Sequence, residues 1–521
     1  METSAVTPAV RKGFFRRLMN WRGALFLLAA FITLVALLLA EENWRGTRAW
    51  RNYKREMEAK GESFDPARLI PPKVPDNQNF AMTPYFAPIF NLPPEVLRQP
   101  PKLVTNMVNG REVVEPMQIV RGTNIANQLP DPDLPPHRAG WHFGSAADLI
   151  GWAVAFQDTN SAARRPEITD SVQAASIVLE NMKPYESTLA ELQSGSERPY
   201  CRYNVPYEEW DNPQVMSALL EHLSMMKGLY RLLSLHAEAE MVLGRNGQAL
   251  KDINVMFRLN NGLGDEPLLI SELVRFACTS IMLQSVGEGL AEHRWSDAEL
   301  QVLQEHLQKT DLVASIVRAL YGERDICTNP NFDRWNSARY GWYSMLRGWN
   351  RLEQRNINRA FHDMMLPRID LAARVINPSV NHSLDLAFKK LSDGNWFRIA
   401  FIEHSIFAKM LVPLSSVLPH AAFAQSEVDM AMLACALERY RLAQGQYPEE
   451  LNALVPSFIA VLPHDIINGQ PLKYRRTANG RFILYSIGWN EKDDGGVVAT
   501  NKDKHQDVLQ GDWVWQYPEG N

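Results

Sequence analysis

A short stretch near the C-terminus gathers the side chains best suited to chemistry. Residues 485–496 read YSIGWNEKDDGG, an apolar run followed by polar and acidic residues and two glycines. Clustered carboxylates suit a metal ion or an acid–base reaction, and Gly495 and Gly496 let backbone carbonyls turn inward. The same composition is typical of a solvated turn. The stretch is therefore a candidate metal-binding loop, a candidate active site or a plain surface turn.

Elsewhere the sequence lacks the motifs of common enzyme classes. It contains no HExxH, no G-x-S-x-G and no Walker A pattern. His137 and His142 could be ligands, but they are more typical of loop histidines that bond to the backbone. Glu323 has no visible partner, whereas glycoside hydrolysis needs two carboxylates. The lone GxG in residues 261–266 is more typical of a turn before a helix than of a phosphate cradle. We predict no catalytic residue and do not favour an enzyme.

The net charge and the spacing of the cysteines argue against several further functional classes. The 521 residues carry a net charge of −5, so no basic surplus indicates nucleic-acid binding. None of the four cysteines is spaced as CxxC, which argues against a zinc knuckle or a thioredoxin motif. Cys278 and Cys435 lie in apolar helical patterns and are predicted core residues. Cys201 and Cys327 lie in turn-rich stretches, and they are either free or joined in a disulfide in an oxidising compartment.

Residues 23–40 are uncharged and apolar over a length that can cross a membrane. Eighteen helical residues span about 27 Å, close to the hydrocarbon thickness of about 30 Å. A basic tail, residues 1–22, precedes the span, and Trp21 and Trp44 flank it as interfacial aromatics do. We predict an uncleaved transmembrane anchor. A cleaved signal peptide is the alternative, disfavoured because no A-x-A site follows.

The charges beside this anchor are balanced. Five Lys or Arg residues precede the span and five follow it up to residue 55, so the positive-inside rule does not decide the orientation. Three of the leading arginines lie nearest the membrane, whereas Glu41 and Glu42 open the trailing side. This asymmetry favours a cytoplasmic N-terminus and an extracytoplasmic bulk.

The segment after the anchor differs from the centre of the chain. Residues 41–144 form a juxtamembrane and proline-rich region, because residues 61–140 hold 15 of the 32 prolines. Helices cannot run through that density, so we expect an extended segment lying against a helical body. Residues 145–421 read as that body. Ser296 and Glu299, for example, form a capping box at the start of one of its helices.

Part of the body resembles a tetratricopeptide-type hairpin. Pro213 starts a helix with apolar residues at three- and four-residue spacing, and Gly244 ends it. In residues 237–253, Gly244 and Ala249 fall where that family packs two helices closely. The resemblance covers about one hairpin and implies an all-α, TPR-like solenoid.

The C-terminal region, residues 422–521, predicts a small α+β domain. Ser426 and Asp429 indicate a capping box, and the helix that follows stops at Gly445. Two β-rich runs then meet at a turn containing Gly480, which predicts a hairpin. A late DWVW segment predicts a last strand with both tryptophans on one face.

This order of elements resembles the globular head of type II secretion major pseudopilins over about 95 residues. That family shows a Gly-x-Tyr-Pro turn, a Pro-Asp-x-x-Gly-x-x-x-x-Tyr segment and a Tyr-Ser-x-Gly strand. The matching residues are Gly445, Tyr447, Pro448, Pro463, Asp465, Gly469, Tyr474, Tyr485, Ser486 and Gly488. The chain departs from the family because some 380 residues separate anchor and head, and no glutamate stands at the fifth position after Gly13. Processing by prepilin peptidase and assembly into a filament are therefore not expected.

The resemblance implies a calcium site in the acidic loop, because the corresponding pseudopilin loop binds calcium. Calcium takes about 6–8 oxygens from carboxylates and carbonyls. The candidate ligands are Asn490, Asp493, Asp494, Asp507 and Asp512. The alternative is a solvated loop without metal, favoured by the Lys-containing and weakly acidic stretch between the two groups of candidates.

These observations predict a structural or interaction protein. The chain as a whole is similar to large anchored proteins of planctomycete-type bacteria that pair such a head with a helical body. We expect a single-pass protein of the bacterial inner membrane with protein partners in an envelope or secretion-like assembly. The alternatives are an envelope hydrolase and a ligand-binding receptor, either of which would use the helical body.

Overall fold

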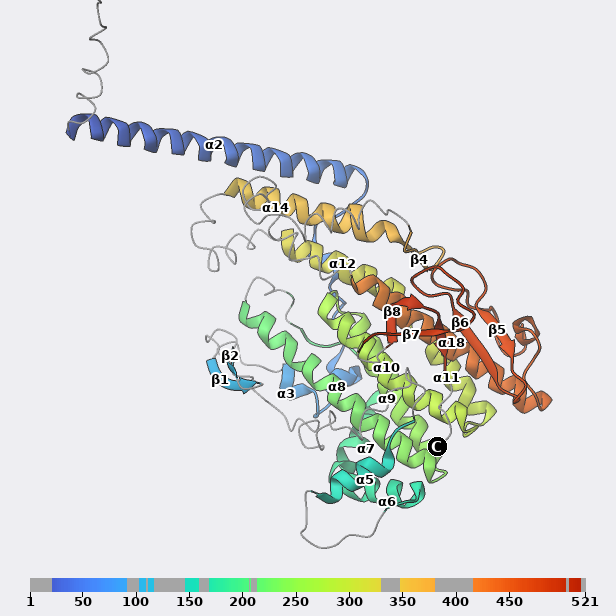
Figure 1. The fold of residues 1–521 in the computed structure, drawn as a ribbon. Helices are drawn as coiled ribbons and strands as arrows, with labels where there is room; N and C mark the ends of the chain where they lie inside the picture. The colour runs from blue at the N-terminus through green and yellow to red at the C-terminus, as the bar shows by residue number, and fades with distance from the viewer. Residues whose placement is uncertain are drawn as a thin grey trace, which may run out of the picture. The chain divides into compact units, whose positions relative to one another are not determined.

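The computed structural model describes residues 21–90, 103–108, 111–116, 146–158, 168–205, 207, 213–328, 347–379, 416–502 and 506–516. The protein is mainly helical, with a few short strands near the C-terminus (Figure 1). It divides into two compact units. One contains the helices α2 and α14, and the other contains the remaining helices and the C-terminal strands.

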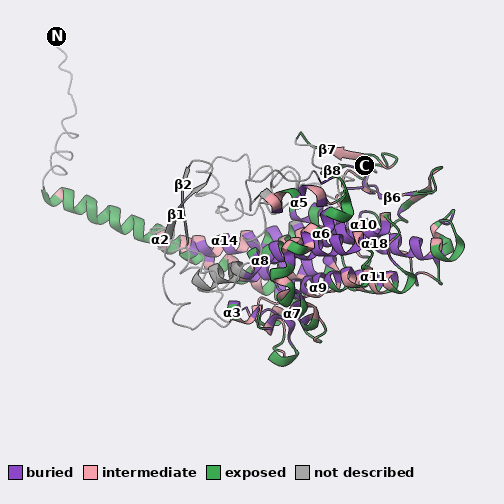
Figure 2. Cartoon of the chain, turned by 90° about the horizontal axis from the view of Figure 1, so that it is seen from below, coloured by how far each residue is buried: buried purple, intermediate pink, exposed green. Residues whose placement is uncertain are grey.

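Helix α2, Trp21–Ala59, contains the predicted anchor and continues well past it. Its apolar window is 0% buried, and Phe26 and Phe31 are 70% and 63% exposed. Figure 2 shows the apolar N-terminal part of this helix exposed. By length and composition α2 can cross a membrane. Helix α10, Leu269–Ala291, passes the same test, but 67% of its window is buried and it packs as a core helix.

Helix α14, Arg347–Arg359, packs closely against the part of α2 beyond the apolar span. A Cβ atom on Gly46 would overlap the backbone of Gly348, so glycine at both positions permits the approach. Two hydrogen bonds fix the crossing: the Gly348 amide donates to Asn43 Oδ1 at 2.7 Å, and Trp349 Nε1 donates to Glu42 Oε2 at 3.2 Å.

The helical body consists of successive helices, and turns of two to five residues join those between residues 213 and 328. Its helices are α5 (Leu149–Asp158), α6 (Ser171–Met182), α7 (Glu186–Ser196), α8 (Pro213–Val242), α9 (Asn246–Gly264), α10, α11 (Asp297–Lys309) and α12 (Leu312–Thr328). Helix α8 packs against α6, α9 and α10. Pro213 starts α8 as predicted, and Ser296 and Glu299 form the predicted capping box.

The described start of the proline-rich segment lies on this body, as expected. It forms η1 (Pro66–Leu69), η2 (Asp76–Gln78), η3 (Phe80–Met82) and α3 (Ala87–Phe90). Phe80 is fully buried, and its amide donates to the carbonyl of Tyr200 at 2.7 Å. Further along, β1 (Leu103–Val108) and β2 (Arg111–Pro116) pair as an antiparallel hairpin.

The C-terminal strands lie against α18, Val417–Gln444. The strands β5 (Lys473–Arg476), β6 (Phe482–Ser486) and β9 (Trp513–Trp515) form an antiparallel sheet, and β7 (Val498–Thr500) pairs with β8 (Gln506–Gly511). The hairpin is as predicted, and both tryptophans of β9 are buried. The shorter elements are η7 (Lys183–Tyr185), η10 (Ala360–Met365), η11 (Leu366–Arg368), β3 (Ile369–Asp370), β4 (Val375–Ile376) and η14 (Leu451–Leu454).

Helix α18 is shared by the helical body and the C-terminal α+β region, residues 422–521, called the head below. It packs against α10 and α11 and also against β8 and β9, and Figure 2 shows it buried over most of its length. The boundary expected between residues 421 and 422 falls inside this helix. The prediction that Ser426 and Asp429 cap its start is wrong, because both are buried inside it, and the helix begins at Val417.

Candidate functional site

A small pocket opens at the end of the body where α6 and α7 meet the C-terminal end of α8. Its volume is ≈ 250 Å³. The lining residues are Ser176, Leu179, Glu180, Met182, Lys183, Glu186, His236, Glu240, Leu243 and Arg245. Apolar and ionisable side chains therefore share one pocket. Pockets of this kind, with a few convergent polar groups, are the usual location of ligand sites.

Glu240 and His236 are the most buried ionisable groups of this pocket, at 6% and 8% exposed. Asp252 fixes the orientation of the His236 ring. Its Nδ1 lies 2.6 Å from Oδ2 of Asp252, which is fully buried on α9. Gln193 donates to the other oxygen of Asp252 at 2.6 Å. The ring's Nε2 is 3.7 Å from Glu240 Oε1, and it has no hydrogen-bond partner among the described residues. A carboxylate on one nitrogen and an open second nitrogen suit proton transfer or ligand binding.

The electrostatics of the pocket favour a charged His236. Burial lowers the pKa of this imidazole, but the hydrogen bond to Asp252 and the charges of Asp252 and Glu240 outweigh burial, so the pKa is raised overall. Arg245 Nε pairs with Glu240 Oε2 at 2.6 Å. Lys183 pairs with Glu180 at 2.6 Å on the opposite wall. Each wall thus contributes a cation and an anion.

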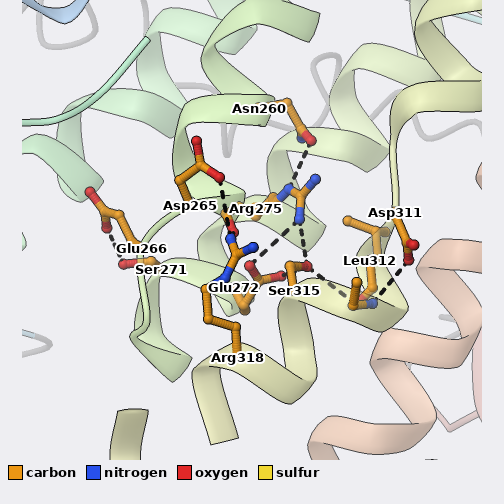
Figure 3. A network of polar contacts seen from close by, with 12 residues as sticks. Asn260, Asp265, Glu266, Ser271, Glu272, Arg275, Asp311, Leu312, Ser315 and Arg318 are labelled. Carbon is orange, nitrogen blue, oxygen red and sulfur yellow. Dashed lines mark hydrogen bonds and ion pairs between the residues drawn. The ribbon is translucent and has the colours of Figure 1, made fainter. Parts of the chain in front are cut away.

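A second polar cluster joins buried side chains of the body (Figure 3). Arg275 is 3% exposed, and its Nε donates to Asn260 Oδ1 at 2.9 Å. Its Nη1 donates to Ser315 at 2.5 Å and lies 3.5 Å from the fully buried Glu272. Gly264 makes room, since a Cβ there would meet the guanidinium at 2.4 Å. This cluster ties α9, α10 and α12 together and has a structural role.

Beside this cluster, Glu266 links two further elements. Its Oε1 lies 2.8 Å from His222 Nε2, and its Oε2 accepts a hydrogen bond from Ser271. Both His222 and Glu266 are 1% exposed. This buried pair therefore joins α8 to the turn between α9 and α10.

A third cluster contains two acids on neighbouring helices. Glu238 accepts hydrogen bonds from Ser234 at 2.7 Å and from Ser285 at 3.2 Å. Glu288 accepts from Gln284 and, at 2.8 Å, from the amide of Ala147. Burial raises the pKa of Glu238 to about 7. Burial and the nearby Glu238 charge also raise the pKa of Glu288 well above its usual range.

In the C-terminal region, Asp465 contacts other residues that carry the predicted pseudopilin resemblance. Its carboxylate, 1% exposed, accepts from Ser486 Oγ at 2.8 Å and from the amides of Ile467 and Ile487 at 3.0 Å each. The Gly469 amide donates to the backbone carbonyl of Asp465 at 2.8 Å. One buried acid thus joins the loop before β5 to the end of β6.

The structure brings four of the five predicted metal ligands into one hydrogen-bonded loop. Asn490 donates to Asp494 at 3.0 Å, and the amide of Asp494 donates to Asp512 at 3.2 Å. Asp493 accepts from Tyr485 at 3.0 Å and pairs with Lys473 at 3.1 Å.

Asp507 is the fifth candidate ligand, and in the part of the chain that the structure describes it does not join this hydrogen-bonded loop. Asp507 accepts only from the amide of Leu509, at 3.0 Å, among the described residues. Asp512 is fully buried and also accepts from the Gly496 amide at 2.6 Å. Within the described ranges, no three His, Cys, Asp or Glu side chains are grouped so as to hold a metal ion. Calcium binding by this loop stays a prediction.

Calcium titration of the detergent-solubilised full chain tests that prediction. The resemblance leads us to expect one calcium per chain, bound after the Asp493–Lys473 pair opens, with heat of binding measured by calorimetry. Asp494→Asn should weaken binding, because calcium prefers carboxylate ligands. Asp370→Asn, an exposed acid outside the loop, serves as the control. A wild-type chain that binds no calcium at millimolar concentration would contradict the prediction.

The other sequence candidates have structural roles or lie outside the described residues. Glu323 accepts from the amide of Leu269 at 3.2 Å and so stabilises the start of α10. The glycines of residues 261–266 form the last turn of α9 rather than a turn before a helix, and Gly262 lets Cys201 approach. His137 and His142 lie outside the described residues.

The cysteines bear out the core predictions. Cys278 and Cys435 are fully buried, as expected. Cys201 is a free, buried thiol, so the alternative of a disulfide to Cys327 is not realised in this structure. The side chain of Cys327 lies outside the described set. Burial raises the pKa of the Cys201 thiol to about 12, which makes it unreactive.

Comparison with known proteins yields no relative: no family model, curated protein or solved structure matches the chain.

The candidate-site residues that sequence reasoning missed are His236 and Glu240, which line the pocket, and Asp252, which contacts His236. The first two belong to the segment SLHAEAEMV, which carries three ionisable residues at alternate positions inside a strongly apolar helix. Ionisable residues in a core helix need partners, and this was the available signal. The partner, Asp252, lies on another helix and could not be identified from spacing.

Proposed function

We propose that the chain is a membrane-anchored structural or interaction protein of a bacterial envelope or secretion-like assembly. The observation that carries the proposal is the exposed apolar part of α2, 0% buried, in the same chain as a large helical body. Most ionisable clusters of the body are closed and join helices, as expected of a scaffold. In this proposal the body is TPR-like, the head is pseudopilin-like, and both lie outside the cytoplasm.

A basic face of α2 supports a role in binding partners. At about 100° per residue, Arg48, Arg51 and Arg55 lie about 140–200° around the helix from Gly46, which contacts α14. All three arginines are exposed. A cationic face directed away from the helix's own packing surface suits an acidic partner.

Co-purification from gently solubilised membranes tests the proposal. We expect the wild-type chain to retain stoichiometric envelope or secretion proteins, and the triple variant Arg48→Glu, Arg51→Glu, Arg55→Glu to lose them by charge repulsion. The matched control is Lys60→Glu, an exposed charge change at the end of the same segment. A wild-type chain that purifies alone, as a monomer, would count against an assembly role.

An enzyme or a receptor is the second candidate function, and the specific observation that favours it is the His236 pocket. Asp252 fixes one ring nitrogen, and the other has no hydrogen-bond partner among the described residues. A screen of the purified chain against model ester, glycoside and peptide substrates distinguishes an enzyme from a receptor. Hydrolysis that His236→Gln abolishes would establish catalysis.

A further inference from the structure

The pocket between α6, α7 and α8 has a charge pattern that selects a particular kind of ligand. Its acids are Glu180, Glu186 and Glu240, and its bases are Lys183, Arg245 and, when protonated, His236. The two signs are therefore balanced. A simple anion would meet three carboxylates, and a simple cation would meet three cationic groups. A ligand that carries both charges avoids either penalty.

The cationic groups at the C-terminal end of α8 and in the turn after it can receive a carboxylate. Arg245 uses Nε to pair with Glu240, so its two terminal nitrogens keep the planar fork that binds carboxylates. These nitrogens have no hydrogen bond to another described residue, and the Arg245 side chain is 54% exposed. His236 Nε2 lies 3.7 Å from Glu240 Oε1 and has no hydrogen-bond partner among the described residues, so it can add a buried donor when the ring is protonated. Asp252 stabilises that charge at Nδ1.

The start of α7 can receive an ammonium group. Glu186 starts α7 and is exposed at the pocket wall. It interacts with the charge of Lys183 but has no close ion pair with any described residue, whereas Glu180 is paired with Lys183 at 2.6 Å. Glu186 is thus the acid of this pocket whose charge is most available to an incoming cation.

The remaining wall is apolar. Leu179, Met182 and Leu243 line it, and Met182 is 1% exposed. Burial of an aliphatic side chain against these residues adds about 25 cal/mol per Å² of apolar area. The volume of ≈ 250 Å³ is below the usual range of about 300–1,000 Å³ for drug-sized ligands, which indicates a small molecule.

We propose that this pocket binds a free α-amino acid with an aliphatic side chain. The carboxylate contacts Arg245 and His236, the ammonium contacts Glu186, and the side chain lies on the leucine and methionine wall. This site is independent of the assembly function proposed above, because it is on the body rather than on α2 or the head.

Calorimetry on the detergent-solubilised full chain tests the proposal with L-leucine as the probe. Two analogues each remove one charge: N-acetyl-L-leucine lacks the ammonium, and L-leucinamide lacks the carboxylate. We expect L-leucine to bind and each analogue to bind at least about tenfold more weakly, because each leaves a charged group of the pocket unpaired. These comparisons use the unaltered protein and so do not depend on the folding of a variant.

Variants then assign the contacts. Arg245→Gln and Glu186→Gln should each weaken L-leucine binding at least about tenfold. Glu197→Gln, an exposed acid at the far end of α7, should bind as the wild type does. Failure of L-leucine to bind at millimolar concentration would overturn the proposal. Equal binding of N-acetyl-L-leucine would overturn it as well, since the pocket would then be an anion site, and equal binding of L-leucinamide would make it a cation site.

Discussion

Replacement of Arg275 by methionine should destabilise the helical body by about 3–5 kcal/mol, because it leaves a buried carboxylate without its cation. Glu272 is fully buried and lies 3.5 Å from the guanidinium. Burial already raises the pKa of Glu272 against the opposing effects of Arg275 and Ser315. Without the arginine, Asn260 Oδ1 also loses the hydrogen bond that it accepts from Arg275 Nε at 2.9 Å.

A neighbouring arginine provides the matched control. Arg318 pairs with Asp265 at 3.2 Å, but the two side chains are 38% and 58% exposed (Figure 3). Exposed pairs contribute about 0–1 kcal/mol. Arg318 also donates to the carbonyl of Gly264 at 2.5 Å, so Arg318→Met should cost somewhat more than the pair alone but clearly less than Arg275→Met. The measurement is the urea midpoint of tryptophan fluorescence for both variants in detergent.

A double variant separates the lost charge pair from lost packing. Arg275→Met combined with Glu272→Met removes both charges, and replacement of a buried pair by apolar groups is often neutral or stabilising. We therefore expect the double variant to recover most of the stability lost by Arg275→Met. An Arg275→Met chain as stable as the Arg318→Met control would contradict the structural role of the network.

The contrast between two capping motifs shows which parts of the fold are readable from sequence. Ser296 and Glu299 satisfy each other and their own helix start, so their effect is local and the prediction is confirmed. Ser426 and Asp429 show the same kind of spacing in the middle of α18. Both are buried there, and Asp429 accepts a hydrogen bond from Gln425 at 3.0 Å. Next to them, Gln425 accepts a hydrogen bond from the amide of Leu312, at 2.7 Å, and so caps α12 instead.

In the candidate site, too, features set by neighbouring residues were predictable and contacts between distant residues were not. The anchor span, the hairpin and the buried cysteines depend on runs of neighbouring residues, and composition predicts them. The pair His236 and Asp252 joins two helices across a turn, and the pocket is completed by Glu186 from a third helix. Asp465 and Ser486 are likewise 21 residues apart. Such contacts are set by tertiary packing, which no local pattern specifies.

The acid cluster around Glu238 should make the protein less stable as the pH rises. The folded state raises the pKa of this acid from 4.5 to about 7, so folded chains keep a proton that unfolded chains lose. Stability is therefore fully present below about pH 4.5 and falls as the pH rises through about 7. A shift of this size corresponds to about 3 kcal/mol, and Glu288, whose pKa is also raised, adds a loss of the same sign.

Substitution by glutamine isolates this contribution from the rest of the chain. Glu238→Gln keeps the acceptor for Ser234 and Ser285 but cannot ionise. Relative to the wild type, the variant should gain stability between about pH 5 and pH 8, measured as the difference in urea midpoint at each pH. Glu305→Gln removes an exposed glutamate on α11 and should leave the pH profile unchanged. A wild type and a Glu238→Gln variant with parallel pH profiles would show that the buried carboxyl ionises as easily in the folded chain as in the unfolded one.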